Sequence, residues 1–180
     1  MRANFMVGPV IGLSASAAVA VLAFAAAAPV ASAQQPPTAA SLEGVWKITK
    51  VVKTGADPRV DTHPQPGLQI IYRGYFSIVR DNGSDLRKAS PPPKDPANLT
   101  DAEKAARYDE WAPFAASAGA YELKGDTLIT HNIVAKQVRG VGLTEEATIR
   151  FEGADTFVAT AKAPPDTPAY GRQTTYTRVR

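Results

Sequence analysis

Short β-rich segments, each ended by turn-forming residues, are the feature that most restricts what this chain can fold into. β-branched and aromatic side chains dominate these segments, while Gly, Asn, Asp and Pro fill the gaps between them. Most of them follow each other as neighbours in a meander, which favours an all-β fold, either an antiparallel up-and-down barrel or a sandwich. We predict eight strands, over residues 44–52, 67–72, 75–80, 119–124, 126–135, 146–152, 156–163 and 172–179.

Two proline-rich stretches and one helix interrupt this pattern. Residues 53–66 form a polar loop with three prolines, and residues 81–99 hold Pro91, Pro92, Pro93 and Pro96, which cannot pair in a sheet. The longer stretch is either a lid over a binding site or a disordered loop. Thr100 and Glu103 have the spacing of a capping box, so a short helix begins there and ends near Trp111 or Ala112, before Pro113. Its apolar face predicts that it packs on the barrel; that face holds Ala105, Tyr108, Trp111 and Ala112.

The N-terminal region differs in composition from the rest of the chain. No charged residue lies between Arg2 and Glu43, and an alanine-rich apolar run ends at the A-x-A pattern Ala31-Ser32-Ala33. This order predicts a signal peptide over residues 1–33, a flexible mature N-terminus over 34–41 and a barrel domain over 42–180. The alternative is an uncleaved membrane anchor. With cleavage, no stable membrane span remains, and we expect a periplasmic or secreted protein.

Composition also excludes several classes of function. The 19 basic and 17 acidic residues after Arg2 leave a net charge of +2, scattered along the chain, which does not predict a nucleic-acid-binding surface. The chain has no cysteine and two widely separated histidines, so we predict no metal site and no cofactor. No serine stands in a G-x-S-x-G frame. The sequence indicates no oligomeric state.

Two motifs resemble a known family. Gly44-Val45-Trp46 is similar to the G-x-W start of the first strand in calycin barrels, and residues 111–133 carry A-G-x-Y followed by D-T-L-x-x-H. This order resembles the bacterial and fungal lipocalin-like domain family, with this chain as a secreted bacterial member, and the resemblance extends over residues 42–179. It implies an eight-stranded antiparallel up-and-down lipocalin-like barrel with one short helix. Such a barrel is wide enough for filled side chains or for one small ligand.

Trp46 and Arg178 are the predicted structural pair. In such a barrel Trp46 would lie at the closed end, where a cationic residue of the last strand stacks on its indole; Arg178 is the first candidate and Arg150 the second. Strand alternation then predicts the inward side chains. They are Trp46, Ile48, Ile70, Tyr72, Phe76, Ile78, Tyr121, Leu123, Ile129, His131, Ile149, Phe151, Phe157 and Tyr176.

Three functions are compatible with this set. The first is binding of a small hydrophobic molecule inside the barrel, with ligand contacts from Tyr72, Phe76, Tyr121, His131, Phe151 and Tyr176. The second is an isomerase or cyclase that uses His131 as its acid or base, although a histidine bonded to a neighbouring strand's hydroxyl is the structural interpretation of the same residue. The third is a structural module with a filled core.

Overall fold

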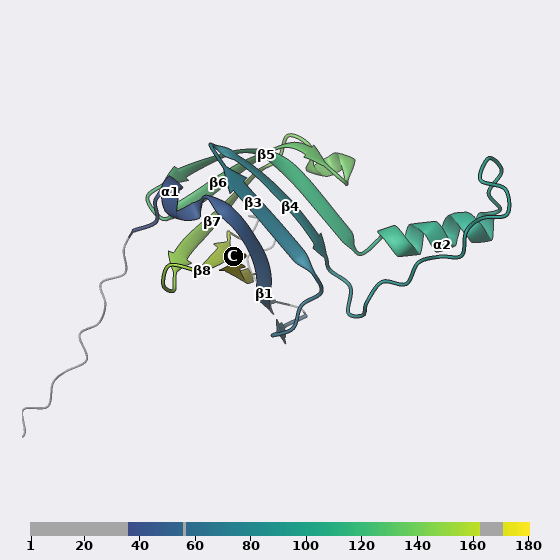
Figure 1. The fold of residues 1–180 in the computed structure, drawn as a ribbon, viewed down its shortest axis with the longest axis horizontal. Helices are drawn as coiled ribbons and strands as arrows, with labels where there is room; N and C mark the ends of the chain where they lie inside the picture. The colour runs from purple at the N-terminus through teal and green to yellow at the C-terminus, as the bar shows by residue number, and fades with distance from the viewer. Residues whose placement is uncertain (1–35, 56, 163–170) are drawn as a thin grey trace, which may run out of the picture. The chain divides into compact units, whose positions relative to one another are not determined.

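A computed structural model describes residues 36–55, 57–162 and 171–180 of the protein (Figure 1). The predicted signal peptide, residues 1–33, lies outside the described residues. None of the helices in the described ranges is both long and apolar enough to cross a membrane. The strands are β1 (Gly44–Thr54), β2 (Arg59–Asp61), β3 (Gly67–Tyr72), β4 (Tyr75–Asp81), β5 (Phe114–Lys124), β6 (Thr127–Ala135), β7 (Thr144–Phe151), β8 (Thr156–Ala161) and β9 (Gly171–Arg178). The helices are α1 (Ala39–Leu42), α2 (Asp101–Trp111) and the 3₁₀ turn η1 (Val138–Gly140).

The strands form a closed antiparallel barrel. From β3 to β9 each strand pairs with the next, and β1 closes the ring by pairing with both β3 and β9. The remaining strand, β2, continues the edge of β1 beyond β3, where Val51, Val52 and Lys53 pair with it. Eight strands therefore build the barrel, and the predicted all-β class is confirmed. Closure pairs the strand edges that would otherwise promote aggregation.

One end of the barrel is closed by the aromatic core and α1. Trp46 is fully buried, contacts Phe157 edge to face with 4.7 Å between ring centroids, and donates from Nε1 to the Leu42 carbonyl at 2.7 Å. Although residues 34–41 are expected to be flexible, Thr38 caps α1 with a capping box. Leu42, the last residue of α1, then packs fully buried in the core.

The predicted pairing of Trp46 with Arg178 is confirmed. The guanidinium carbon of Arg178 lies 4.1 Å from the indole centroid. The same group donates to the carbonyls of Glu43 at 2.6 Å and Ser41 at 2.8 Å, and its Nε lies 3.6 Å from a carboxylate oxygen of Asp155. Arg178 thus ties the last strand to the segment that leads into β1, which makes the pair part of the closure of this end.

The glycine of the A-G-x-Y motif is required by a close approach of two strands. A Cβ at Gly119 would lie 1.9 Å from the carbonyl oxygen of His131 on β6, at the register shift between Ala118 and Gly119. No side chain can occupy that space, so the shift needs glycine there. The A-G-x-Y and D-T-L-x-x-H motifs therefore belong to one β5–β6 contact.

The segment between β4 and β5 projects from the barrel. Asp81 still pairs with Phe114, so residues 82–113 form an excursion from an otherwise continuous hairpin (Figure 1). The capping box and the end of the helix at Trp111 are as predicted. The prediction that this helix packs on the barrel is wrong, because no residue of α2 is buried and Tyr108 is 73% exposed. Its other side chains are mostly charged, so few apolar groups are available for packing.

The proline-rich stretch lies along α2. Ser90 Oγ donates to the Ala106 carbonyl at 3.1 Å, and the Lys94 N–H donates to Glu103 Oε1 at 3.3 Å. The Arg107 guanidinium also donates to the Pro91 carbonyl at 3.4 Å. In this structure the stretch is therefore fixed to its own helix, and these contacts do not make it a lid over the barrel.

The inward phase predicted for β3 is wrong by one residue. Ile71 is 1% exposed and Gln69 is also buried, whereas Ile70 is 49% and Tyr72 55% exposed on the outer face. The adjacent isoleucines allow either phase from sequence alone. A shift of one residue reverses every side chain of a strand, and here packing against the core selects Ile71.

Candidate functional site: a cavity in the open half of the barrel

A cavity of about 310 Å³ lies inside the barrel. The seven strands from β3 to β9 contribute to its wall, and buried rings of Phe76, Phe157 and Tyr176 form its floor above the Trp46 cluster. The other lining residues are Gln69, Ile78, Arg80, Ser117, Leu128, Thr130, Glu145, Glu146, Ala147, Ala159, Ala161, Lys162, Arg172 and Thr174. The interior is therefore filled at one end and open toward the other.

The floor of the cavity is aromatic and ordered by stacking. Phe157 and Tyr176 lie parallel, with 4.7 Å between centroids and 14° between planes. Burial raises the pKa of the Tyr176 phenol, and the positive charges of Arg80 and Arg172 oppose that rise. The phenol therefore stays neutral at physiological pH and keeps its O–H as a hydrogen-bond donor.

Two arginines enter the cavity from different strands. Arg80 follows Phe76 and Ile78 on the inward side of β4, and Arg172 precedes Thr174 and Tyr176 on the inward side of β9. Within the described residues, the buried Nε of Arg80 has no hydrogen-bond partner, and its guanidinium forms no ion pair. A buried donor without a partner carries a desolvation cost.

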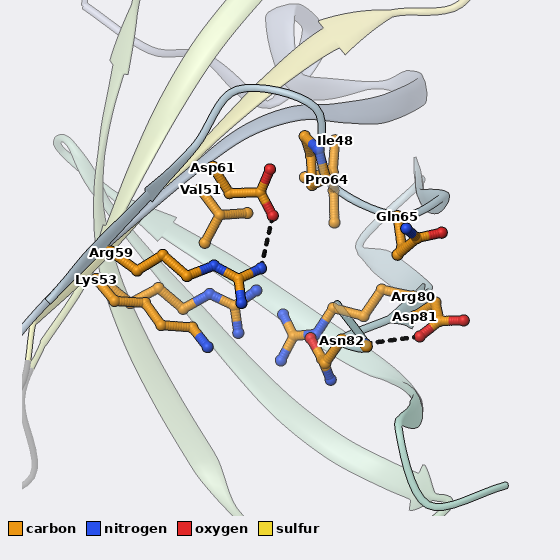
Figure 2. Close-up of a pocket in the computed structure, with 12 residues that line it drawn as sticks. Ile48, Val51, Lys53, Arg59, Asp61, Pro64, Gln65, Arg80, Asp81 and Asn82 are labelled. Carbon is orange, nitrogen blue, oxygen red and sulfur yellow. Dashed lines mark hydrogen bonds and ion pairs between the residues drawn. The ribbon is translucent and has the colours of Figure 1, made fainter. Parts of the chain in front are cut away.

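The mouth next to this cavity is rich in positive charge. A smaller pocket there is lined by four basic residues and two aspartates, and shares Arg80 and Arg172 with the cavity. Asp61 is paired with Arg59 at 2.8 Å (Figure 2), and Asp81 is paired with Arg87 at 3.2 Å. The hydrogen bond from Arg59 lowers the pKa of Asp61, so this acid is ionised at neutral pH. Neither aspartate neutralises Arg80.

The acidic side chains of the cavity lie on β7 and have partners of their own. Glu145 Oε2 accepts a hydrogen bond from Asn132 Nδ2 at 3.2 Å. Glu146 Oε2 lies 2.8 Å from Lys162 Nζ, which lowers the pKa of that carboxyl. The cavity is therefore polar on two sides, with carboxylates on β7 and guanidinium groups on β4 and β9.

The structure brings two of the six predicted ligand residues to this cavity. Phe76 and Tyr176 line it. Tyr121 is buried in the core, and Phe151 packs edge to face on Trp46 with 6.2 Å between centroids. Tyr72 is on the outer face, where the Arg73 guanidinium lies 5.1 Å from its ring centroid. His131, the sixth of these residues, does not line the cavity.

His131 does not face the cavity, contrary to the prediction from alternation. Its side chain is 42% exposed on the outer face of β6, where Nδ1 lies 3.0 Å from Thr144 Oγ1 and Nε2 lies 3.4 Å from Glu122 Oε1. Leu128 and Thr130 face inward instead. Leu128 and Ile129 are adjacent and apolar, so the sequence permits both phases. The hydrogen bond to a neighbouring strand's hydroxyl is the one expected under the structural interpretation.

The two cavity arginines are the site residues that sequence reasoning missed. A signal for them exists: Arg80 continues the inward alternation of Phe76 and Ile78, and Arg172 continues that of Tyr176. A charged residue in an inward position of a predicted barrel is unusual enough to mark a site. Among the described residues, no cluster of three or more His, Asp or Glu side chains could hold a metal ion.

No protein-family model matches the chain. No curated protein matches it either. Among solved structures, a redesigned β-barrel is similar, with 12% sequence identity and a TM-score of 0.42, over 79% of this chain and 95% of that one.

Proposed function

We propose that this protein is an exported, lipocalin-like barrel that binds one small hydrophobic molecule in its interior. The observation that carries the proposal is the cavity of about 310 Å³ above an aromatic floor. That volume lies at the lower end of the range for small-molecule sites, about 300–1,000 Å³. The ligand is accordingly small.

The driving force for binding is burial of apolar surface. Phe76, Ile78, Leu128 and Phe157 supply apolar contacts, and each Å² of ligand surface removed from water contributes about 25 cal/mol. The alternative, a structural module with a filled core, fits only the Trp46 end of the barrel. The open half supports binding.

The exported location rests on the sequence. The uncharged alanine-rich run and Ala31-Ser32-Ala33 are typical of a signal peptide and its cleavage site. N-terminal sequencing of the protein secreted by its host is expected to begin at Gln34. A mature protein that begins at Met1 would contradict this part of the proposal.

No observation favours the isomerase or cyclase. The pairing of His131 with Glu122 lies on the outer face of the barrel, away from the cavity, so it offers no enclosed site in which to position a substrate.

The test is displacement of an environment-sensitive apolar dye, with two variants that change neighbouring residues on opposite faces of β7. Ala147 lines the cavity, whereas Thr148 is exposed. We expect the wild type to bind about one dye per chain. Ala147→Phe fills the cavity and is expected to weaken binding at least about tenfold, while Thr148→Phe binds as the wild type does. Absence of saturable binding by any apolar probe, or equal binding by both variants, would refute the proposal.

A further inference from the structure

We propose that the ligand is a small amphipathic acid, whose carboxylate is held by Arg80 and Arg172 while its apolar part lies on the aromatic floor. This inference rests on the proposed function and specifies the chemical class of the ligand. It is carried by the position of the two arginines, by the charges around them and by the neutral donors beside them.

The positions of the arginines define a polar end of the cavity. On β4 the inward residues run from Phe76 at the floor through Ile78 to Arg80. On β9 the order is reversed in sequence, and Arg172 lies four residues before Tyr176. β1 leaves the closed end at Trp46, β4 runs in the same direction as β1, and β9 runs in the opposite direction. Arg80 near the end of β4 and Arg172 near the start of β9 therefore both lie toward the open end. A molecule that enters therefore meets cations at the mouth and apolar rings at the floor.

Basic side chains outnumber acidic ones in the lining of the pocket at this mouth. Lys53 and Arg59 line it together with the two cavity arginines, and Figure 2 shows Arg59 and Arg80 extending into the same space from different sides. The two aspartates of the pocket are held by Arg59 and Arg87. Positive charges gathered in a cleft raise the local concentration of anions. The buried Nε of Arg80 also offers a donor that an anion would satisfy.

Neutral donors stand beside the guanidinium groups. Tyr176 lies close enough to Arg80 and Arg172 for their charges to act on its phenol, and buried Thr174 lies between it and Arg172 along β9. The acidic wall on β7 is occupied by Asn132 and Lys162. Guanidinium groups bind carboxylates with paired, charge-assisted hydrogen bonds, which favours a carboxylate as the head group.

The size of the cavity sets the length of the acid. A volume of 310 Å³ equals about ten water molecules at roughly 30 Å³ each. An acid of about ten non-hydrogen atoms matches that volume, and octanoate is such an acid. Octanol has the same chain without the charge, so this pair isolates the contribution of the carboxylate.

The experiment measures affinities for octanoate and octanol at pH 7 by calorimetry or by displacement of the apolar dye. The wild type is expected to prefer octanoate by at least about tenfold, because a hydrogen bond to a charged group changes affinity by about tenfold to a hundredfold. Arg80→Gln and Arg172→Gln are each expected to remove most of this preference and to leave octanol affinity within about twofold. Arg150→Gln is the matched control, since Arg150 is exposed on β7 and paired with Glu152.

The outcomes separate this inference from the proposed function. If octanol binds as tightly as octanoate, or if both cavity variants keep the preference for octanoate, the arginine site is refuted and the apolar cavity stands. If neither compound nor any apolar dye binds, the proposed function fails and this inference fails with it. A thermal melt of each variant confirms that it is folded, and Arg80→Lys, which keeps the charge but removes the planar group, is expected to fall between wild type and Arg80→Gln.

Discussion

Adjacent isoleucines in β3 provide a direct test of how this strand faces the core. Ile71 is 1% exposed and belongs to the core cluster, whereas Ile70 is 49% exposed on the outer face. Both are changed to alanine, one at a time. Because both substitutions are chemically identical and occur in one strand, the loss of β propensity is similar in the two variants, and the difference between them reports burial.

The expected difference is large. Ile71→Ala removes buried carbons and leaves a cavity in the core cluster, which costs about 2–5 kcal/mol of unfolding free energy. Ile70→Ala removes groups that are half in water and leaves no cavity, so we expect a cost of about 1 kcal/mol. The variants should therefore differ by roughly 2 kcal/mol or more.

The assay is urea denaturation followed by tryptophan fluorescence, with equal m-values required for comparison. Trp46 lies in the same core, so its emission reports the transition. Equal costs, or a larger cost for Ile70→Ala, would show that β3 presents its other face to the interior. That result would also place Tyr72 inside, as alternation from the sequence predicts.

Three further substitutions test other parts of the structure. Arg178→Gln removes the stacking on Trp46 and two charged hydrogen bonds, and is expected to lower the unfolding free energy by about 3 kcal/mol in urea denaturation. The control, exposed Arg150→Gln, should lower it by less than about 0.5 kcal/mol. Equal costs would contradict the structural role of the Trp46–Arg178 pair. Gly119→Ala places a Cβ against the His131 carbonyl and is expected to abolish soluble folded protein or lower its melting temperature by more than about 10 °C. A melting temperature equal to that of the wild type would show that the two strands can separate there. Burial raises the pKa of Tyr176 above 10.0, so its contribution to stability is complete below pH 10 and declines as the pH rises through the folded-state pKa. As the pH rises above 10, the unfolding free energy of Tyr176→Phe should therefore fall less than that of the wild type. Identical pH profiles of stability for the two proteins would contradict the burial of this phenol.

Much of the fold follows from local patterns. The eight barrel strands, the capping box at Thr100 and the helix end before Pro113 are visible in the sequence, because turn residues and proline act over a few residues. The short strand β2 was not predicted, since three residues in a proline-containing loop carry no pattern of their own. It forms because the second half of β1 has an edge left open beyond β3.

The site could be predicted only in part. Phe76 and Tyr176 were identified because aromatic residues at alternating positions indicate an interior. Arg80 and Arg172 were missed although they have the same phase, since an interior arginine runs against the usual burial of charge. Alternation with Ile129, Ile133 and Ala135 predicts that His131 faces inward. The structure instead buries Leu128 and Asn132, on the other face of β6, which leaves His131 outside beside Thr144.

The sequence by itself determined the strands, their meander order and the turn positions, because each depends on side chains a few residues apart. Only the tertiary structure decided which face of β3 and β6 is inside, and that one half of the barrel is filled while the other holds a cavity. These depend on which side chains from distant strands occupy the same volume. Arg80 and Arg172 lie 92 positions apart in the chain, and barrel closure alone brings them to one mouth.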